Sequence, residues 1–240
     1  MAWGHFEDLN PRRFRAIMKR TPVAFIPFAM HEWHGEALPF GTDMFRARYT
    51  MAAVARRVGG IVMPSPWGTC ITRRMDGQTR WGMECHARMP LDGNMCRLRT
   101  ATFRAMVEDI YDACQHMGFE LAVSYTSHLS PIQTAVLRRS TDKWNDQHTM
   151  VALNVQPGRT WAPPGDTSRH ADAGEAAEIK LIEPKLVHAD RYARSEADVA
   201  TGLQPQHASL IKVKLGRELQ DETINEIARE TQRTIKRLGL

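Results

Sequence analysis

A segment of mixed acidic and imidazole residues near the N-terminus has the composition of a divalent-metal site. Glu32 and His34 are two residues apart, so their side chains face the same side of an extended backbone. Asp43 follows at a predicted helix start, from which it can fold back toward them. Carboxylate and imidazole are ligands that zinc, manganese and iron accept. Taken alone, the segment is also compatible with an ordinary surface loop.

Residues of the same types follow two later predicted strands. His128 comes after a strand expected at 119–125, and His170 and Glu175 come after one expected at 150–155. In an open parallel sheet the carboxyl ends of the strands lie along one edge, and ligands bind there. The sequence therefore predicts that six groups converge at that edge: Glu32, His34, Asp43, His128, His170 and Glu175.

The elements that must position these residues alternate between strands and helices. The apolar run at 22–30 is too short for a typical helix and predicts a strand buried on both faces. Such alternation predicts parallel pairing in an α/β protein, and nothing marks a second domain within residues 1–240. Further strands are expected at 61–64, 119–125 and 150–155, and helices at 42–58, 100–117, 131–139, 173–182 and 216–238.

Composition excludes several classes of protein. The 240 residues are 42% apolar and 25% charged, which is typical of a globular chain and not of disorder or a coiled coil. The apolar run of nine residues is far below the ~20 that span a bilayer, and the N-terminus lacks signal-peptide features, so we expect a cytoplasmic protein without a membrane partner. The net charge of +5 is mixed along the chain, and the basic run at 12–20 is expected to be a solvated helix face, not a nucleic-acid site. The four cysteines form no Cys-x-x-Cys pair, which favours free thiols.

The same residues carry a family resemblance. Residues 32–43, read as Glu-x-His-Gly-x-x-Leu-Pro-x-Gly-Thr-Asp, resemble the signature of the creatininase family of metal-dependent amidohydrolases. Thr126-Ser127-His128 sits where that family has Asn-Gly-His after a strand. Residues 170–175, followed by 183–187, align with the family's His-Ala-Gly-x-x-Glu-Thr-Ser segment and its downstream Pro-x-Leu-Val.

This resemblance implies a three-layer α/β sandwich with a mainly parallel sheet, a two-metal centre holding zinc or manganese, and a homo-oligomer, often a hexamer. Iron also accepts such ligands, so the sequence does not exclude it. It implies that Glu32, His34, Asp43 and His128 bind metal, that Glu175 is a further ligand or acts beside them, and that His170 is the acid/base. Such a site uses a metal-activated water to break a C–N bond of a small cyclic or linear amide, while the histidine passes a proton to the leaving nitrogen.

The chain departs from the family pattern at three places. Glu36-Ala37 replaces a common second histidine, Leu129-Ser130-Pro131 replaces a loop that can carry a carboxylate ligand, and Ala176-Ala177 replaces Thr-Ser. These departures argue against creatinine as the substrate. They leave open a one-metal site, lactone opening or keto-sugar isomerisation at the same site, and a non-catalytic subunit with this fold. Trp161, in a loop expected at 156–174, is a candidate lid over the substrate or a packing residue at a subunit contact.

Overall fold

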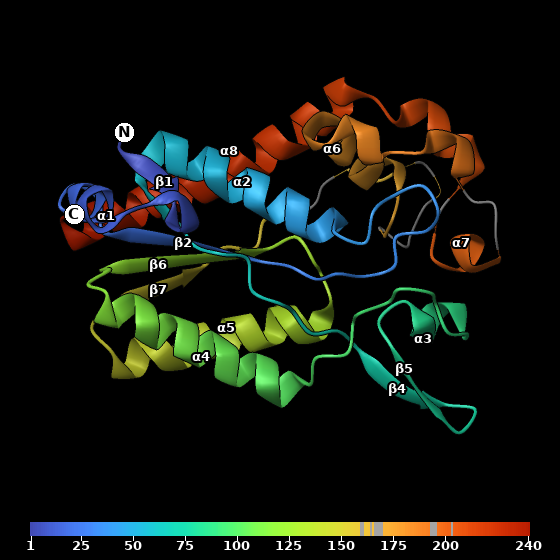
Figure 1. Cartoon of the computed structure of the whole chain (residues 1–240), viewed down its shortest axis with the longest axis horizontal. Coiled ribbons are helices and arrows are strands. Elements are labelled where there is room, and N and C mark those ends of the chain that lie inside the picture. The colour runs from blue at the N-terminus through green and yellow to red at the C-terminus, as the bar shows by residue number, and fades with distance from the viewer. Residues whose placement is uncertain (159–160, 164, 166–169, 193–195, 203) are drawn as a thin grey trace.

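A five-stranded parallel sheet forms the centre of the protein (Figure 1). The computed structural model describes residues 1–158, 161–163, 165, 170–192, 196–202 and 204–240. The strand order is β1-β3-β2-β6-β7, with the longest pairing between β2 and β6, where Val23 to Phe28 faces Leu121 to Thr126. The strands are β1 (Trp3–His5), β2 (Val23–Phe28), β3 (Gly60–Val62), β6 (Leu121–Thr126) and β7 (Val151–Asn154).

Helices cover both faces of the sheet, which makes three layers. Alternate residues of β2 show the division, because Phe25 packs in one apolar cluster with α2 and α8, whereas Ile26 and Phe28 pack in another with α4 and α5. In Figure 1, α2, α6 and α8 lie on one side of the sheet and α4 and α5 on the other. The predicted α/β sandwich with a mainly parallel sheet is thus confirmed. The long helices are α2 (Thr42–Val58), α4 (Thr100–His116), α5 (Pro131–Gln147), α6 (Ala173–Ile182) and α8 (Val213–Leu238).

Shorter elements complete the described chain. The basic residues Arg12, Arg13 and Arg15 lie exposed on α1 (Pro11–Met18), as expected of a solvated helix face. Among the described helices, none is long and apolar enough to cross a membrane. The remaining elements are the hairpin strands β4 (Thr72–Met75) and β5 (Gln78–Trp81), the helices α3 (Glu84–Ala87) and α7 (Glu196–Ala200), and the 3-10 turns η1 (Phe6–Asp8), η2 (Pro184–Leu186), η3 (Ala189–Arg191) and η4 (Pro205–Leu210).

The structure departs from the sequence prediction in three places. Strand β1 and the β4–β5 hairpin were not expected, because three or four residues are too few to show a period. Helix α5 continues to Gln147 instead of ending at residue 139, since Trp144 alone among residues 140–147 is apolar and the pattern fades there. The expectation of four free thiols is wrong for Cys70 and Cys96, which form a disulfide; Cys85 and Cys114 are free.

The close approach of α6 and α8 depends on a glycine. A Cβ on Gly216, near the start of α8, would collide with the backbone carbonyl of Ala177 in α6. Because α6 also carries Glu175, the spacing of the two helices helps to determine where that carboxylate lies.

The Gly216→Ala variant is expected to destabilise the protein by about 1–3 kcal/mol, because the added methyl meets backbone that cannot rotate away. Helix propensity alone predicts the opposite sign, a gain of about 1 kcal/mol. Urea denaturation measures the difference. Lys214→Ala, at an exposed position of the same helix, is the control and should shift stability by less than about 0.5 kcal/mol. A Gly216→Ala protein as stable as the wild type would show that α8 can move away from α6 freely.

Candidate metal centre

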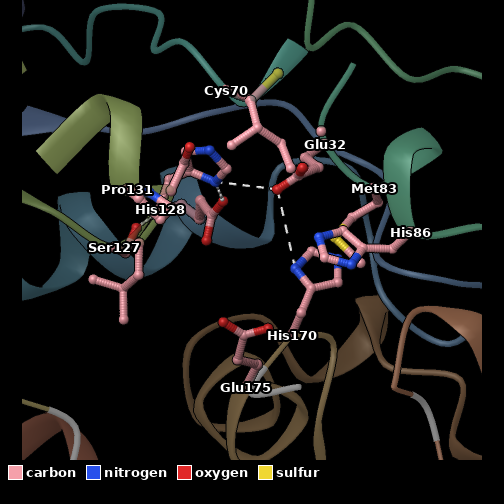
Figure 2. A pocket seen from close by; sticks show the side chains of 14 residues that line it. Glu32, Cys70, Met83, His86, Ser127, His128, Pro131, His170 and Glu175 are labelled. Atoms are coloured by element: carbon pink, nitrogen blue, oxygen red, sulfur yellow. Dashed lines mark hydrogen bonds and ion pairs between the residues drawn. The ribbon is translucent and has the colours of Figure 1, made fainter. Parts of the chain in front are cut away.

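The six predicted site residues lie together at the carboxyl edge of the sheet. The segment after β2 carries Glu32 and His34, the first turn of α2 carries Asp43, and His128 follows β6 by two residues. Figure 2 shows how Glu32, His128, His170 and Glu175 surround one cavity. Parallel pairing of β2 with β6 produces this convergence, because both strands end at the same level of the sheet.

Glu32, Asp43 and His128 form the first half of the cluster. His128 Nδ1 lies 3.1 Å from Glu32 Oε2 and 3.2 Å from Asp43 Oδ2, and all three side chains are buried. The hydroxyl of Thr126 accepts a hydrogen bond from the backbone N–H of His128 at 3.1 Å and thereby holds the turn after β6. Burial alone would lower the pKa of His128, but the two carboxylates outweigh it and raise the pKa to about 10. Without metal, His128 is therefore an imidazolium shared by two carboxylates.

His34, Asp43 and Glu175 form the second half. His34 Nδ1 donates to the backbone carbonyl of Glu32 at 3.0 Å, so the lone pair of the neutral ring is on Nε2. That buried nitrogen has no hydrogen-bond partner among the described residues. It lies 3.9 Å from Asp43 Oδ1 and 3.7 Å from Glu175 Oε2. His34 Nε2 thus lies close to one oxygen of each of two carboxylates, at separations a little longer than the ~3.4 Å between ligands of a tetrahedral ion with bonds near 2.1 Å.

Asp43 connects the two halves. Its Oδ2 faces His128 and its Oδ1 faces His34, so one carboxylate can serve two cations. Burial would raise the pKa of Asp43, but His128, His34 and Arg46 hold it well below its usual range. Asp43 is therefore an anion at every pH at which the protein is used.

His170 borders both halves of the cluster. Its Nε2 donates to the backbone carbonyl of Trp33 at 2.7 Å, which leaves the Nδ1 lone pair directed toward Glu32 Oε2, 4.0 Å away. Its ring centroid is 4.4 Å from that of His34. Burial and the neighbouring His34 lower the pKa of His170 despite the nearby carboxylates. A neutral imidazole held in one orientation is suited to accept and return a proton.

The start of α6 determines where Glu175 points. Asp172 caps the helix by accepting the N–H of Glu175 at 2.9 Å, and Ala171, with a φ of 50°, turns the chain into the cap. The N–H of Ala171 donates to Glu175 Oε2 at 2.6 Å. The tight turn thus places His170 and Glu175 side by side.

Arg46 and Glu178 complete the cluster, and the sequence analysis missed both. Arg46 Nη1 donates to Glu175 Oε1 at 2.7 Å, and its Nε donates to Glu178 Oε2 at 2.8 Å. Gln220 of α8 donates to the other oxygen of Glu178 at 2.6 Å. The available signal was helical spacing, because Asp43 and Arg46, like Glu175 and Glu178, are three residues apart and share a helix face.

The charges in the cluster do not balance. Its four carboxylates, Glu32, Asp43, Glu175 and Glu178, are buried in the described structure with a single guanidinium, that of Arg46. Unpaired buried charge is costly. The excess of negative charge, like the unpartnered Nε2 of His34, fits one or two bound divalent cations.

Trp161 lies apart from the lining of the cavity. It is half buried against an apolar cluster that includes Leu38, Ala171 and Tyr192 and so supports the turn that carries His170. It is not among the described residues that line the cavity. Its role as a lid stays a prediction, and residues 159–160, 164 and 166–169 of the same loop lie outside the described residues.

Comparison with known proteins agrees with this architecture: a parallel α/β protein with carboxylates and histidines gathered at the strand ends. The creatininase family, described as creatinine amidohydrolase, matches residues 7–229, so the chain belongs to this family. No curated protein matches the chain.

Solved structures show the same fold at low sequence identity. A creatinine amidohydrolase (creatininase) is 16% identical, with 96% of this chain and 97% of that chain covered and a TM-score of 0.73. A structure named creatininase Mn is 17% identical over 96% of this chain and 98% of that chain, with a TM-score of 0.73. A mutant creatininase of Zn-Zn type is 16% identical over 96% of this chain and 97% of that chain, with a TM-score of 0.74.

We expect Arg46→Met to destabilise the metal-free protein by about 3–5 kcal/mol, because it leaves Glu175 and Glu178 buried without their counter-charge. Urea denaturation in the presence of a chelator measures this. Arg48→Met on the same helix is the matched control, since Arg48 pairs with Glu7 at the exposed surface, and its loss should cost about 0–1 kcal/mol. Equal losses in the two variants would contradict the assignment of Arg46 as a buried counter-ion.

Proposed function

We propose that this protein is a metal-dependent hydrolase that cleaves the C–N bond of a small cyclic or linear amide. One observation carries the proposal: the buried His34 Nε2, which has no hydrogen-bond partner among the described residues, lies within 4 Å of two carboxylate oxygens, Asp43 Oδ1 and Glu175 Oε2. Membership of the creatininase family, and the Mn and Zn–Zn forms among the similar structures, support a hydrolase with zinc or manganese.

The ligands divide between two positions. Glu32, Asp43 and His128 would hold one ion, and His34, Asp43 and Glu175 the other, with Asp43 shared. Ions bound there would supply Lewis-acid polarisation of the substrate carbonyl and a water of lowered pKa. Arg46 keeps Glu175 ionised and fixed in place, since it binds the oxygen that faces away from His34.

His170 is the proposed acid/base. It lines the cavity, with its Nδ1 4.0 Å from Glu32 Oε2, and an imidazole there can take a proton from the attacking water and return it to the leaving nitrogen. The bond from Nε2 to the Trp33 carbonyl keeps the ring from rotating. The same contact stabilises the imidazolium that forms, because its N–H dipole points at an oxygen.

The remaining predictions concern the size of the substrate, the oligomeric state, the number of domains and the location in the cell. The cavity has a volume of only about 190 Å³, which favours a small-molecule substrate over a polymer. A homo-oligomer, a single domain over residues 1–240 and a cytoplasmic location stay predictions.

Metal content and turnover test the proposal together. Protein purified without added metal or chelator should contain about one or two equivalents of zinc or manganese by elemental analysis. Glu32→Gln and His128→Ala should lose metal and turnover while remaining folded by circular dichroism. His170→Gln should keep its metal but hydrolyse amides at least about 100-fold more slowly. Glu108→Gln, which alters only an exposed ion pair with Lys143, is the control.

The substrate screen pairs cyclic and linear amides with lactones and keto sugars. Turnover of amides alone supports the proposal, whereas turnover of lactones or keto sugars alone would reassign the same centre to another carbonyl reaction. Protein that binds neither zinc nor manganese after reconstitution would be a non-catalytic relative.

Metal affinity should rise with pH. Below a pKa of about 10 the metal-free protein carries a proton on His128, and an ion must displace that proton to bind. The apparent affinity for zinc should therefore increase about tenfold per pH unit between roughly pH 6.5 and 8.5. Competition with a chromophoric chelator measures it. An affinity that is flat over this range would show that zinc does not displace a proton from His128.

A further inference from the structure

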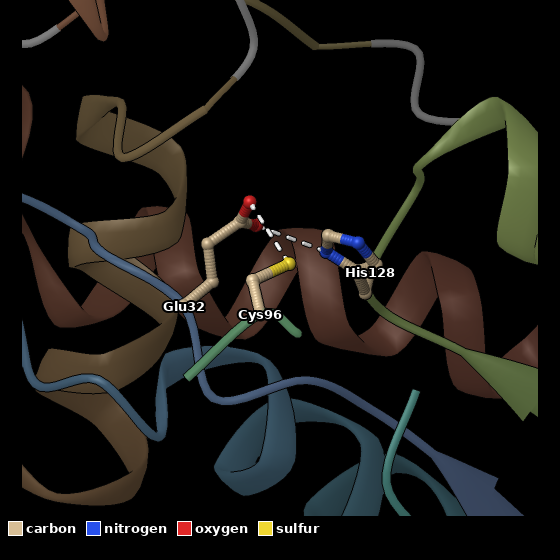
Figure 3. A group of neighbouring side chains, drawn as sticks. All are labelled: Glu32, Cys96 and His128. Atoms are coloured by element: carbon tan, nitrogen blue, oxygen red, sulfur yellow. Dashed lines mark hydrogen bonds and ion pairs between the residues drawn. The ribbon is translucent and has the colours of Figure 1, made fainter. Parts of the chain in front are cut away.

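Two cysteines lie against the first half of the metal centre. Cys70 follows β3 and Cys96 precedes α4, and both are buried. Cys96 Sγ is 3.9 Å from Glu32 Oε1, and Figure 3 shows the sulfur directed toward Glu32 and His128. One ligand atom from each of Cys96, Glu32 and His128 lies within 4.8 Å of the others, which is close enough for a single ion.

A glycine encloses this group. Gly82, between β5 and α3, has a φ of 56°, and a Cβ there would lie 2.5 Å from Glu32 Oε1 and 2.9 Å from Cys96 Sγ. Only a residue without a side chain leaves room for the carboxylate and the sulfur together. The backbone of this turn therefore closes directly over the pair.

Hydrogen bonds tie the cysteine segment to the ligand turn. Gln133 accepts the N–H of Thr69 at 2.6 Å and donates to the hydroxyl of Thr126 at 2.7 Å. Thr126 in turn accepts from the backbone of His128 at 3.1 Å. Cys70 follows Thr69 directly, so the position of the thiol pair is coupled to that of His128.

We propose that in the reduced protein Cys96 Sγ binds, as a thiolate, the ion held by Glu32 and His128, and that the disulfide with Cys70 withdraws this ligand. The inference deepens the proposed function, on which it rests. Thiolate is a soft ligand that favours zinc, whereas carboxylates and imidazole alone accept manganese as well. The redox state of one cysteine pair would thus select the metal of the centre.

Thiol–disulfide exchange with a small disulfide can convert the reduced cysteine pair into the Cys70–Cys96 disulfide. Cys70 lines the cavity, whereas Cys96 is not among its described lining residues, so a small disulfide entering the cavity meets Cys70 first. The Cys70 thiolate attacks that disulfide, forms a mixed disulfide and releases one thiol. Cys96 then attacks Cys70 Sγ, which forms the Cys70–Cys96 bond and releases the second thiol. Two protein thiols are oxidised, and the reagent disulfide is reduced to two thiols.

Cobalt(II) reports the thiolate directly, because a cobalt–sulfur bond adds a near-ultraviolet charge-transfer band that oxygen and nitrogen ligands do not produce. The reduced wild-type protein, Cys70→Ser and Cys114→Ala should show the band, and Cys96→Ser should lack it. Cys114, a buried residue of α4 in the apolar core, is the matched control. Zinc affinity should fall at least about tenfold in Cys96→Ser, while manganese affinity changes little.

The second part of the cobalt experiment oxidises the Cys70–Cys96 pair before the metal is added. Metal-free protein treated with 2-hydroxyethyl disulfide before cobalt is added should lose the band in the wild type, keep it in Cys70→Ser, and regain it after dithiothreitol. Cobalt bound without the band in the reduced wild type would overturn the inference and leave the metal centre intact. A band that persists in Cys96→Ser would also overturn it. Failure to bind cobalt or zinc in any state would refute both this inference and the proposed metal centre.

Discussion

Buried negative charge at one edge of the sheet is the constraint on which the rest of the site depends. Four carboxylates leave water there, and each must be neutralised or strongly hydrogen-bonded. Arg46 forms ion pairs with Glu175 and Glu178. The imidazolium of His128 lies between the other two carboxylates, Glu32 and Asp43. The four carboxylates therefore have counter-charges before any cation binds. A cation bound there would replace a proton in a site that is already held in shape by its own counter-charges, which would limit the reorganisation that binding requires.

The sequence predicted the parts of this arrangement that depend on local pattern. Strand ends locate Glu32 and His128, and the capped start of a helix locates Glu175, so the convergence of the ligands follows from parallel pairing alone. Strand ends differ from the expected positions by one or two residues. Arg46 was missed because its partners Glu175 and Glu178 are about 130 residues away along the chain, and no local rule relates them. The Cys70–Cys96 disulfide and the contact of Gly82 with Glu32 were not predicted for the same reason, because contacts between loops produce no periodic pattern in a sequence.

The fold is retained at low sequence identity, and this chain builds the edge of its sheet from a particular set of loops. At 16–17% identity to the solved creatininases, the sandwich is retained over almost the whole chain. The turn after His128 runs directly into α5, and Gln133 in the first turn of that helix holds Thr69 and Thr126 instead of facing the cavity. The side of the centre nearest α3 is instead formed by two sulfur atoms and a glycine.

The last helix of the chain gives the site an order of assembly. Gln220 of α8 donates to Glu178, which binds the Arg46 that holds Glu175. A residue of α8 therefore completes the network that holds Arg46 of α2 in place. Thr50 of α2 donates to the same Gln220. During synthesis on the ribosome the earlier ligands leave the exit tunnel well before this helix does. Until α8 has emerged and packed, Glu178 therefore lacks the donor to its second oxygen, and the network around Arg46 stays incomplete.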